Sequence, residues 1–535
     1  MPDVIVVGAG LAGMSAAHRL LERGYNVTLI EQNAFLGGKL GAHQDTASTD
    51  WHEHCYHMYL NWYHNFWTFM DEIGARRKFV PQPEVHCLRP GEFGNTLSIA
   101  NVGSPWTYWR NIMSGVESPS DTLISMISLA DLVGQPDQPN RPDDLLERTS
   151  VYGFLASRPY STQGAIENAG RTLAEAFASP SYLSSARSYR SLIRYGARLP
   201  DPMMWLLAEN TETGIFIPWG SRLQKIAKGK EAGKLEIRTL TRVNGLEVVD
   251  GRIAALRLSE LNVSPTIDTA EKVDETSLPN LPVDNEVILA VPLQALYSLL
   301  SPKVLDLAPN LVNVRRLRCE AMISLDVYFN RRIPNVPKGI TVLLESRHNL
   351  SFLDNSQIWQ GVDDTTKLNV IASDCDTLVE YGKVPPKTEQ LKIEQLMLRE
   401  LSRFLQFDPV KDVARCHLQT NVGEELFVNQ VGSWEFRPRT SCGIPNLFIA
   451  GDYCRTFVDV VTVEGAVVSG LMAAEAIRRR HNIGSPIEIR RPDAFPTLAM
   501  AAFAAAQMPT AFAAQAVSTT DRALKSGFKR MFPNG

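Results

Sequence analysis

Hydrophobic positions at the start of the chain follow the order strand, helix, strand. Residues 3–7 (DVIVV) form a short β-branched run, and MSAAHRLLERG at 14–24 carries apolar residues at helical spacing. The run NVTLIE at 26–31 is strand-like again, and the glycine-rich turn GAGLAG at 8–13 joins the first strand to the helix. The pattern predicts a β-α-β unit that begins a parallel sheet.

Later parts of the chain repeat this alternation with two interruptions. Residues 106–213 lack strand alternation and are predicted to be mostly helical, after a helix expected from about Met58 to Gly74. The α/β pattern returns at 214–300, with a helix starting at Arg222 and a buried strand in VDNEVILAVPLQAL. EAMISLDVYF begins a second interruption, after which the strand NLFIAGDYC and the helix TVEGAVVSGLMAAEAIRRR restore the pattern.

This order predicts an α/β fold: a discontinuous Rossmann-type domain, an inserted α+β substrate-binding domain, and an Ala-rich helical C-terminal tail. The expected boundaries are 1–105, 214–300 and 405–485 for the first domain, 106–213 and 301–404 for the second, and 486–535 for the tail.

Composition narrows the class of protein. A chain of 535 residues is expected to form two or three structural units, and a net charge of −4 gives no electrostatic case for binding nucleic acid. The seven cysteines are odd in number, scattered and never spaced as CxxC, so they are interpreted as reduced thiols. The first strand begins at Asp3, which leaves no room for a signal peptide. We therefore expect a cytoplasmic protein.

The N-terminal turn has the spacing of a dinucleotide-binding fingerprint. Gly8 permits the tight turn, Gly10 lets the backbone approach a pyrophosphate, and Gly13 allows the helix to pack closely on the strand. Glu31 ends the second strand, where its carboxylate can accept hydrogen bonds from a ribose. Further contacts to the dinucleotide are expected from Leu11, Ala12 and Gln32. This motif alone leaves FAD and NAD open.

Two other motifs favour FAD. The turn LGGK, with Gly37, Gly38 and Lys39, would lie beside the diphosphate and add positive charge. The late strand ends in AGDY, so Gly451 and Asp452 can face a ribityl hydroxyl. The helix that follows can point its N-terminus at the pyrimidine end of a flavin, where negative charge accumulates on reduction. Its contacts are expected from Val463 and Ala466.

With these motifs the chain resembles the flavin amine oxidase superfamily, and within it the plant-type phytoene and zeta-carotene desaturases and the bacterial hydroxysqualene oxidoreductases. The likeness rests on three segments: VIVVGAGLAG through DWHEHCYHMYLNWYHN, then TGIFIPWGSRLQKIA with TRVNGLEV and VILAVPLQAL, and finally NLFIAGDYCRTFVDVVTVEGAVVSG. It implies an FAD-binding domain of the two-dinucleotide-binding-domain (GR2) type. It also implies cofactor contacts at Val243, Pro292 and His57, with His57 near the isoalloxazine as acid, base or hydrogen-bond partner.

The substrate is less well defined than the cofactor. Desaturases have Gly, Gly and Pro where this chain has Cys55, Asn61 and His64, which predicts a bulkier and more polar wall near the flavin. Amine oxidases of the superfamily usually place an aromatic residue where this chain has Thr462, which favours a non-amine substrate.

We therefore expect hydride abstraction from an apolar, isoprenoid-like or carotenoid-like substrate, with electrons passed to oxygen, a quinone or another acceptor. The alternatives are a flavin amine or amino-acid oxidase, an FAD-assisted isomerase or dehydratase without net redox, and a flavin-binding protein without activity.

Two remaining features leave alternatives open. His52, His54, His57 and His64 lie close together, but no HExxH or Cys/His pairing fixes a geometry, so no metal site is predicted. The tail LAMAAFAAAQMPTAFAAQAV is interrupted by Pro509 and is predicted to be too broken to span a membrane. It either docks on the protein itself or a second subunit, or makes peripheral contact with a membrane. The membrane arrangement would bury Phe503, Phe512, Phe528 and Phe532 and place Lys525, Lys529 and Arg530 on headgroups.

Overall fold

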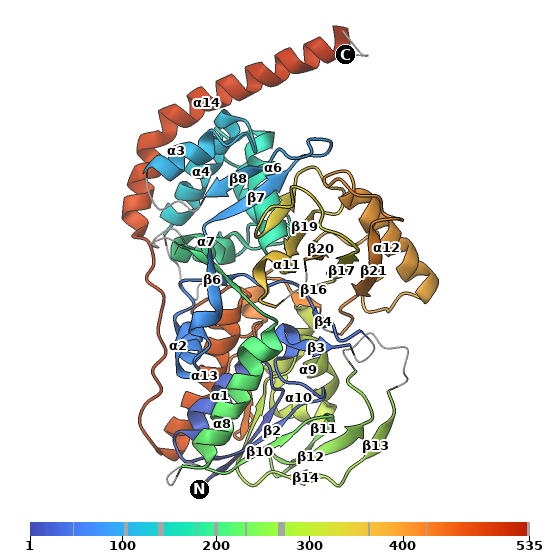
Figure 1. Cartoon of the computed structure of the whole chain (residues 1–535). Helices are drawn as coiled ribbons and strands as arrows, with labels where there is room; N and C mark the ends of the chain where they lie inside the picture. Colours follow the sequence, from blue (N-terminus) through green and yellow to red (C-terminus); the bar gives the residue numbers. More distant parts are fainter. Residues whose placement is uncertain are drawn as a thin grey trace.

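The structure is a computed structural model that describes residues 1–45, 48–100, 105–136, 144–177, 179–196, 202–229, 233–265, 273–361, 364–423 and 425–531. Side chains of the last described residues, from 525 onward, are outside the description, as are Pro105 and 172–177. Three regions are visible in Figure 1: an α/β layer in the lower half, a β-rich layer at the right, and a group of helices at the top.

A parallel five-stranded sheet forms the centre of the lower layer, in the order β10-β2-β1-β15-β23. Its strands are β1 (Asp3–Val7), β2 (Asn26–Ile30), β10 (Leu235–Arg238), β15 (Glu286–Leu289) and β23 (Leu447–Ile449). The three separated α/β stretches therefore form one sheet, which confirms the predicted discontinuous Rossmann-type domain.

Both faces of this sheet are covered, which explains the continuous apolar runs in its strands. Val4 and Val6 of β1 belong to the core formed with α1 (Leu11–Leu21), α8 (Ile217–Ala227) and α13 (Val463–His481). Ile5 and Val7 point to the opposite core, which includes α9 (Leu293–Leu299), α10 (Pro302–Leu307) and the antiparallel strands β11 (Thr241–Val249) and β12 (Arg252–Leu261). Small strands β13 (Glu275–Ser277) and β14 (Leu281–Pro282) extend that sheet.

The β-rich layer is a seven-stranded sheet in the order β21-β17-β20-β19-β18-β7-β8. Its strands are β7 (Glu84–Leu88), β8 (Leu97–Ala100), β17 (Ile323–Phe329), β18 (Thr341–Leu343), β19 (Leu350–Asp354), β20 (Lys367–Ala372) and β21 (Val413–Gln419). Helix α12 (Lys387–Leu401) packs Ile393, Met397 and Leu401 into its core. We propose that the substrate-binding domain extends to β7, β8 and β21, which lie outside its expected boundaries.

Helices make up most of the remaining insertion, as predicted: α3 (Pro105–Ile112), α4 (Pro119–Gly134), α5 (Val151–Ala156), α6 (Gln163–Phe177) and α7 (Ala186–Gly196). Two local predictions were wrong. The helix expected from Met58 is β5 (Tyr59–Leu60) followed by α2 (His64–Glu72), and α8 begins at Ile217 rather than Arg222. The stretch predicted to be mostly helical also contains one strand, β9 (Met204–Leu207), which pairs with β5 and with β6 (Phe79–Gln82). Pairing between distant segments outweighs local propensity here.

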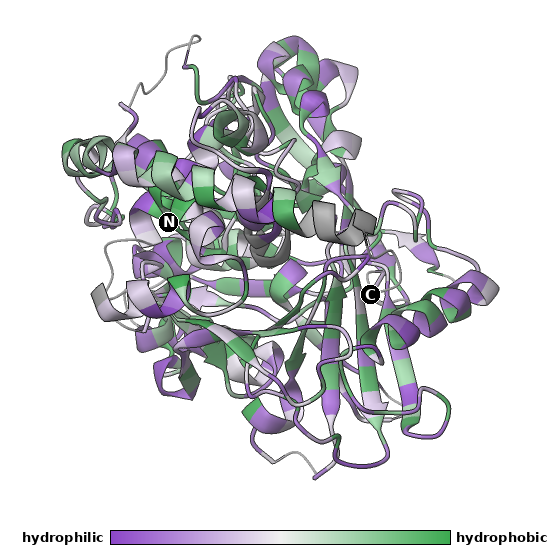
Figure 2. Cartoon of the chain, turned by 90° about the horizontal axis from the view of Figure 1, so that it is seen from above, coloured by the Kyte–Doolittle hydropathy of each residue, from purple (hydrophilic) through white to green (hydrophobic). Residues whose placement is uncertain are grey.

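The tail forms one helix, α14 (Thr497–Met531), and Pro509 does not interrupt it. Ala511 and Ala514 pack with Ile124 and Ile127 of α4, and Ser518 Oγ donates a hydrogen bond to Asp121 at the start of α4. Packing along α4 therefore stabilises a helix that Pro509 alone would weaken. Residues 497–524 are long and apolar enough to cross a membrane by length and composition, which corrects the prediction of a broken segment. Figure 2 shows this helix crossing the upper face of the molecule.

Candidate FAD-binding and active site

The ends of four neighbouring parallel strands bring the predicted cofactor residues to one edge of the sheet. Gly8 follows β1, Glu31 follows β2, Pro292 lies just after β15, and Gly451 lies just after β23. Open α/β sheets bind ligands outside the carboxyl ends of their strands. The topology therefore assembles a single edge from residues separated by more than four hundred positions in sequence.

The first glycine turn is shaped by close backbone approach. A Cβ atom on Gly8 would lie 2.3 Å from the carbonyl oxygen of Ala290, and one on Gly13 would lie 1.9 Å from that of Gly8. A Cβ on Gly10 meets nothing closer than 3.7 Å. Gly8 and Gly13 are thus required by packing within the protein, whereas a Cβ on Gly10 would make only ordinary van der Waals contacts with Gly37 and Gly38. The N-terminus of α1, with Leu11 and Ala12, has no side-chain cap, so its N–H groups can bind a phosphate.

The second glycine turn lies directly against the first. Gly37 forms a backbone bridge with Gly10, and its N–H donates to the carbonyl of Ala9 at 2.9 Å. Gly37 and Gly38 both have positive φ angles, of 116° and 56°, which favour glycine. Lys39 donates from Nζ to the carbonyl of Glu425 at 2.9 Å. The structure thus brings both predicted turns together, and their contacts with the cofactor remain predictions.

Glu31 joins the first turn to the segment after β2. Its Oε2 accepts the N–H of Ala9 at 2.8 Å and its Oε1 accepts the N–H of Asn33 at 2.9 Å. Burial raises the pKa of this carboxyl. Each carboxylate oxygen can accept a second hydrogen bond, so the group can still bind a ribose hydroxyl. Gln32, the next residue, is half-buried. Strand β11 begins beside this segment, because the N–H of Thr241 donates to the carbonyl of Glu31, and Val243 of β11 is also half-buried.

The third predicted segment is the turn before α13. Gly451 donates its N–H to Ser469 Oγ at 2.8 Å, and Asp452 is half-buried beside it. Thr462 caps α13 because its Oγ1 accepts the N–H of Gly465 at 3.1 Å. Val463 and Ala466 lie half-buried in the first turn of this helix. Thr462 thus has a structural role as a helix cap. It also stands at the position where amine oxidases of the superfamily usually have an aromatic residue.

Sequence reasoning gave no role to Glu464, which is completely buried in the first turn of α13. Its carboxylate accepts the N–H groups of Asn65 and Phe66 at 2.9 Å each, at the start of α2, and the side-chain amide of Asn65 at 2.6 Å. Burial raises the pKa of Glu464 to about 7. The residue therefore fixes the first turn of α13 to the start of α2.

His57 lies between β4 (Trp51–Glu53) and β5, at the wall of a pocket that residues of β9 and β19 also line. Its Nε2 is 3.7 Å from Cys55 Sγ, and burial lowers its pKa to about 4, so the ring is neutral at physiological pH. Among the described residues, Nδ1 of His57 and both ring nitrogens of His54 are buried without a hydrogen-bond partner. A neutral imidazole with a buried, unpaired nitrogen fits a polar ring such as that of a flavin.

The other histidines have structural contacts. His52 Nδ1 is 2.7 Å from Asp326 Oδ2, and its ring lies 3.8 Å from that of His417, whereas His64 starts α2. One group of possible metal ligands, His18 with Glu22 and Glu72, occurs among the described residues. Trp219 Nε1 donates to His18 Nδ1, so a neutral His18 carries its proton on Nε2, the atom that faces the two glutamates. That nitrogen has no lone pair for a metal.

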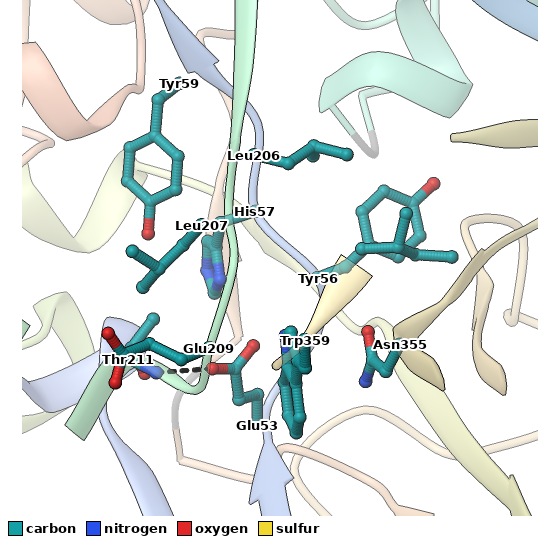
Figure 3. Close-up of a pocket in the computed structure, with 11 residues that line it drawn as sticks. Glu53, Tyr56, His57, Tyr59, Leu206, Leu207, Glu209, Thr211, Asn355 and Trp359 are labelled. Carbon is teal, nitrogen blue, oxygen red and sulfur yellow. Dashed lines mark hydrogen bonds between the residues drawn. The ribbon is translucent and has the colours of Figure 1, made fainter. Parts of the chain in front are cut away.

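The pocket beside His57 combines polar and apolar walls (Figure 3). Glu53 accepts the N–H of Thr211 at 2.7 Å, and Glu209 pairs with Lys78 at 2.8 Å. Burial raises the pKa of Glu53 to about 8. The remaining lining residues are Tyr56, Tyr59, Leu206, Leu207, Leu353, Asn355 and Trp359.

Fold and site together define a dinucleotide-binding flavoprotein. The model of the flavin-containing amine oxidoreductase family matches residues 11–478, and the chain belongs to this family. Its cofactor is FAD. The two adjoining glycine turns, the Glu31 carboxyl just after β2 and the unpaired nitrogens of His54 and His57 are compatible with that cofactor.

Curated relatives of the chain include carotenoid desaturases. A zeta-carotene desaturase of Capsicum annuum is 34% identical over 104 residues, 19% of this chain and 18% of that protein. The 15-cis-phytoene desaturase of the same plant is 21% identical over 497 residues, 89% of this chain and 77% of that protein. The chain thus spans about a fifth of the length of the first relatives that it matches.

Solved structures share the fold across nearly the whole chain. A triple mutant of putrescine oxidase has a TM-score of 0.61 at 16% identity, covering 90% of this chain and 99% of that one. Cyclohexylamine oxidase from Brevibacterium oxydans has a TM-score of 0.57 at 14% identity, with the same coverage. These likenesses confirm the predicted fold class.

Proposed function

We propose that this protein uses FAD to remove a hydride from an apolar, isoprenoid-like substrate held in the pocket beside His57. The observation that carries the proposal is the charge of the pocket. Leu206, Leu207 and Leu353 supply apolar walls, as does Trp359. With a pKa of about 8, Glu53 holds its proton at neutral pH.

The two pocket carboxyls therefore offer little free negative charge to an ammonium group. Glu53 is mostly neutral, and Glu209 is paired with Lys78. An amine substrate would be mostly protonated in solution and would gain little on entering this pocket. The amine oxidases among the solved structures share the fold, and fold alone does not assign a substrate.

The chain's own residues would bind and orient the substrate and exclude water, while FAD supplies the two-electron oxidation. Neutral His57 is in the correct state to accept a proton lost from the carbon next to the oxidised one. The cavity volume is only about 10 Å³, so the leucine and tryptophan walls must move apart around a substrate. Electrons would leave to oxygen, a quinone or another acceptor.

Anaerobic bleaching of the bound flavin tests this proposal. We expect isoprenoids to reduce the visible absorbance of the oxidised flavin and primary, secondary and tertiary amines to leave it unchanged. Bleaching by amines alone would contradict the proposal. Product formed without lasting bleaching and without an acceptor would instead favour the isomerase or dehydratase, for which protonated Glu53 is a suitable acid.

We also propose that α14 makes peripheral contact with a lipid surface. One face of the helix packs on α4, whereas Leu498, Phe503, Phe512, Val517 and Leu524 on it remain exposed. Neighbouring α3 exposes Trp106 and Trp109, with 74% and 56% of their surface accessible. Tryptophan and phenylalanine on an apolar helical face are typical of interfacial binding.

Vesicle flotation measures this contact. Replacing Phe503 and Phe512 by aspartate is expected to lower binding to phosphatidylcholine–phosphatidylglycerol vesicles by at least about tenfold. The reason is that the variant loses two aromatic side chains that the lipid would bury. The matched control replaces Val249 and Val410, two exposed valines on other elements, by aspartate and should bind like the wild type. Equal loss in both double variants would contradict a specific α14 contact.

A further inference from the structure

The turn between β23 and α13, residues 450–462, is supported by a buried arginine. The guanidinium of Arg437 donates hydrogen bonds to the carbonyls of Tyr453 at 3.1 Å and Cys454 at 2.7 Å. Its Nη1 also lies 2.8 Å from Oδ1 of Asp459, later in the same turn. Arg437 is 2% exposed, so this one side chain joins the two halves of the turn from inside the protein.

A second buried arginine reaches the same carboxylate from the inserted helices. Nε of Arg187, in α7, lies 3.2 Å from Asp459 Oδ2 and 3.7 Å from Asp144 Oδ2. Figure 1 shows α7 between the upper helices and the α/β layer. Asp459 has a φ of 52°, a left-handed conformation that persists in residues other than glycine where the surroundings fix it. The two guanidiniums therefore hold Asp459 between the inserted helices and the turn.

Positive side chains outnumber the carboxylates that pair with them here. The guanidiniums of Arg187, Arg437 and Arg455 lie 4.2, 5.4 and 5.6 Å from the centre of the Trp434 ring. Within the described part of the chain, their ion pairs are with the two aspartates named above. The cluster therefore carries an excess of positive charge at the back of the turn.

The acids around the cluster reduce this excess only in part. Glu147 bonds two uncharged donors, the N–H of Trp434 at 2.8 Å and Ser185 Oγ at 2.9 Å. Burial raises the pKa of Glu147 to about 7, so about half of these carboxyls are neutral at physiological pH. Glu435 and Arg439, at the edge of the cluster, are both exposed, and water screens their opposite charges.

The segment in front of this cluster is the one that we expect to face the flavin. Asp452, an expected ribityl contact, directly precedes the two carbonyls that Arg437 holds, and Thr462 caps α13 three residues after Asp459. Hydride transfer to the oxidised flavin forms an N–H bond at N5 and adds one negative charge, which accumulates at the pyrimidine end. Fixed positive charge favours that anionic form over the neutral oxidised form.

We propose that Arg187 and Arg437, held by Asp459, raise the reduction potential of the bound FAD. Arg437 is in addition a positioning residue, because it bonds the backbone of the turn. The Arg187 side chain makes no hydrogen bond to a backbone atom among the described residues and acts through its charge. A more oxidising flavin accepts a hydride from an unactivated carbon more readily, but the inference concerns the flavin alone and does not require the proposed substrate.

The reduction potential is measured on the substrate-free, FAD-loaded protein by stepwise reduction in the presence of a reference dye. Arg187→Gln removes one positive charge and leaves the hydrogen bonds of Arg437 to the turn in place. It is expected to lower the potential by about 30 mV, a tenfold shift in the equilibrium between flavin and dye. Two unit charges about 10 Å apart, at an effective dielectric constant of about 20, produce a shift of this size.

Arg158→Gln is the matched control, because it removes the same charge from a similar setting elsewhere among the inserted helices. Arg158 pairs with Asp131 at 3.2 Å and lies over the Phe154 ring at 3.9 Å. Asp131 bonds Tyr160, which packs against Phe512 of α14, so this pair belongs to the helices next to α14. The potential of this variant is expected to stay at the wild-type value.

Asp459→Asn provides the opposite change. Asparagine tolerates the left-handed backbone conformation and nearly keeps the shape of the side chain, but it removes one negative charge from the cluster. The potential is therefore expected to rise, by about the amount that Arg187→Gln lowers it. A merely structural role has no reason to give shifts of opposite sign in these two variants.

Arg437→Lys separates position from charge. Lysine keeps the positive charge but lacks the planar fork that joins two carbonyls and a carboxylate. The affinity for FAD, followed by quenching of flavin fluorescence, is expected to fall by at least about tenfold, the effect of one or two hydrogen bonds. The potential of this variant should stay closer to the wild-type value than that of Arg187→Gln.

The outcomes are separable. An unchanged potential in Arg187→Gln overturns the inference, and so do shifts of one sign in Arg187→Gln and Asp459→Asn or an equal shift in Arg158→Gln. If Arg187→Gln does not hold FAD, the shift in Asp459→Asn decides, and anything other than a rise overturns the inference. Wild-type FAD affinity in Arg437→Lys overturns its positioning role. Failure of isoprenoids to bleach the flavin would overturn the proposed function and leave these potentials unaffected.

Discussion

Gly10→Ala is expected to lower the affinity for FAD by about a hundredfold, on the order of 3 kcal/mol, while leaving the apoprotein folded. The added Cβ meets no protein atom closer than 3.7 Å, and Gly10 has a φ of −73°, which alanine adopts without strain. The added methyl group does, however, occupy the space through which we expect a pyrophosphate to approach the backbone. Quenching of flavin fluorescence during titration of the apoprotein measures the affinity, and the melting temperature reports the fold.

Gly13→Ala is the informative comparison. Its Cβ would lie 1.9 Å from the carbonyl oxygen of Gly8, so this variant should lose stability even without cofactor. Both variants add a single methyl group to the same turn, but only Gly10→Ala should separate binding from folding. If Gly10→Ala bound FAD like the wild type, the phosphate site would have to lie elsewhere.

Glu464→Ala is expected to lower the free energy of unfolding by about 2 to 4 kcal/mol, because it leaves buried donors of Asn65 and Phe66 unpaired. The start of α2 would separate from α13, so FAD affinity should fall as well. Denaturant unfolding of the apoprotein and the holoprotein measures the two effects. A loss below about 0.5 kcal/mol would show that this carboxylate does not connect the two helices.

The same residue gives the pH dependence a definite sign. The pKa of Glu464 in the folded protein is about 7, above its ordinary value of 4.5, so between these values the folded state binds more protons than the unfolded state. The part of the Glu464 contribution that depends on its bound proton is fully present below about pH 4.5 and is lost as the pH rises to about 7. The hydrogen bonds from Asn65 and Phe66 are a separate contribution, which Glu464→Ala removes. Glu464→Gln should flatten this part of the stability profile.

The local structure of the segments that we expect to bind the cofactor was largely predictable from local patterns. Gly8, Gly10 and Gly13 stand at fixed spacing between a β-branched run and an amphipathic helix, and Glu31 ends the next strand. Each of these constraints acts within about thirty residues, so the sequence displays it directly. The meeting of the three α/β stretches in one sheet also followed, because each carries a buried strand of the same type.

The pocket and its supports depend on contacts that sequence spacing does not display. Glu53 and Thr211 are 158 positions apart, and Glu464 reaches Asn65 across 399. β9 is a strand because Met204–Leu207 lies between β5 and β6, not because of its own composition. The continuity of α14 through Pro509 likewise depends on packing against α4. An acid at the first turn of a late helix, followed by glycine, was the one available signal for Glu464.

The most direct test of the central claim is the cofactor content of the purified full-length protein. The account predicts the visible absorption bands of an oxidised flavin, with one flavin per chain released on denaturation and identified as FAD by its conversion to FMN with a phosphodiesterase. A protein that shows no flavin absorbance, even after incubation of the refolded chain with FAD, would contradict the account as a whole.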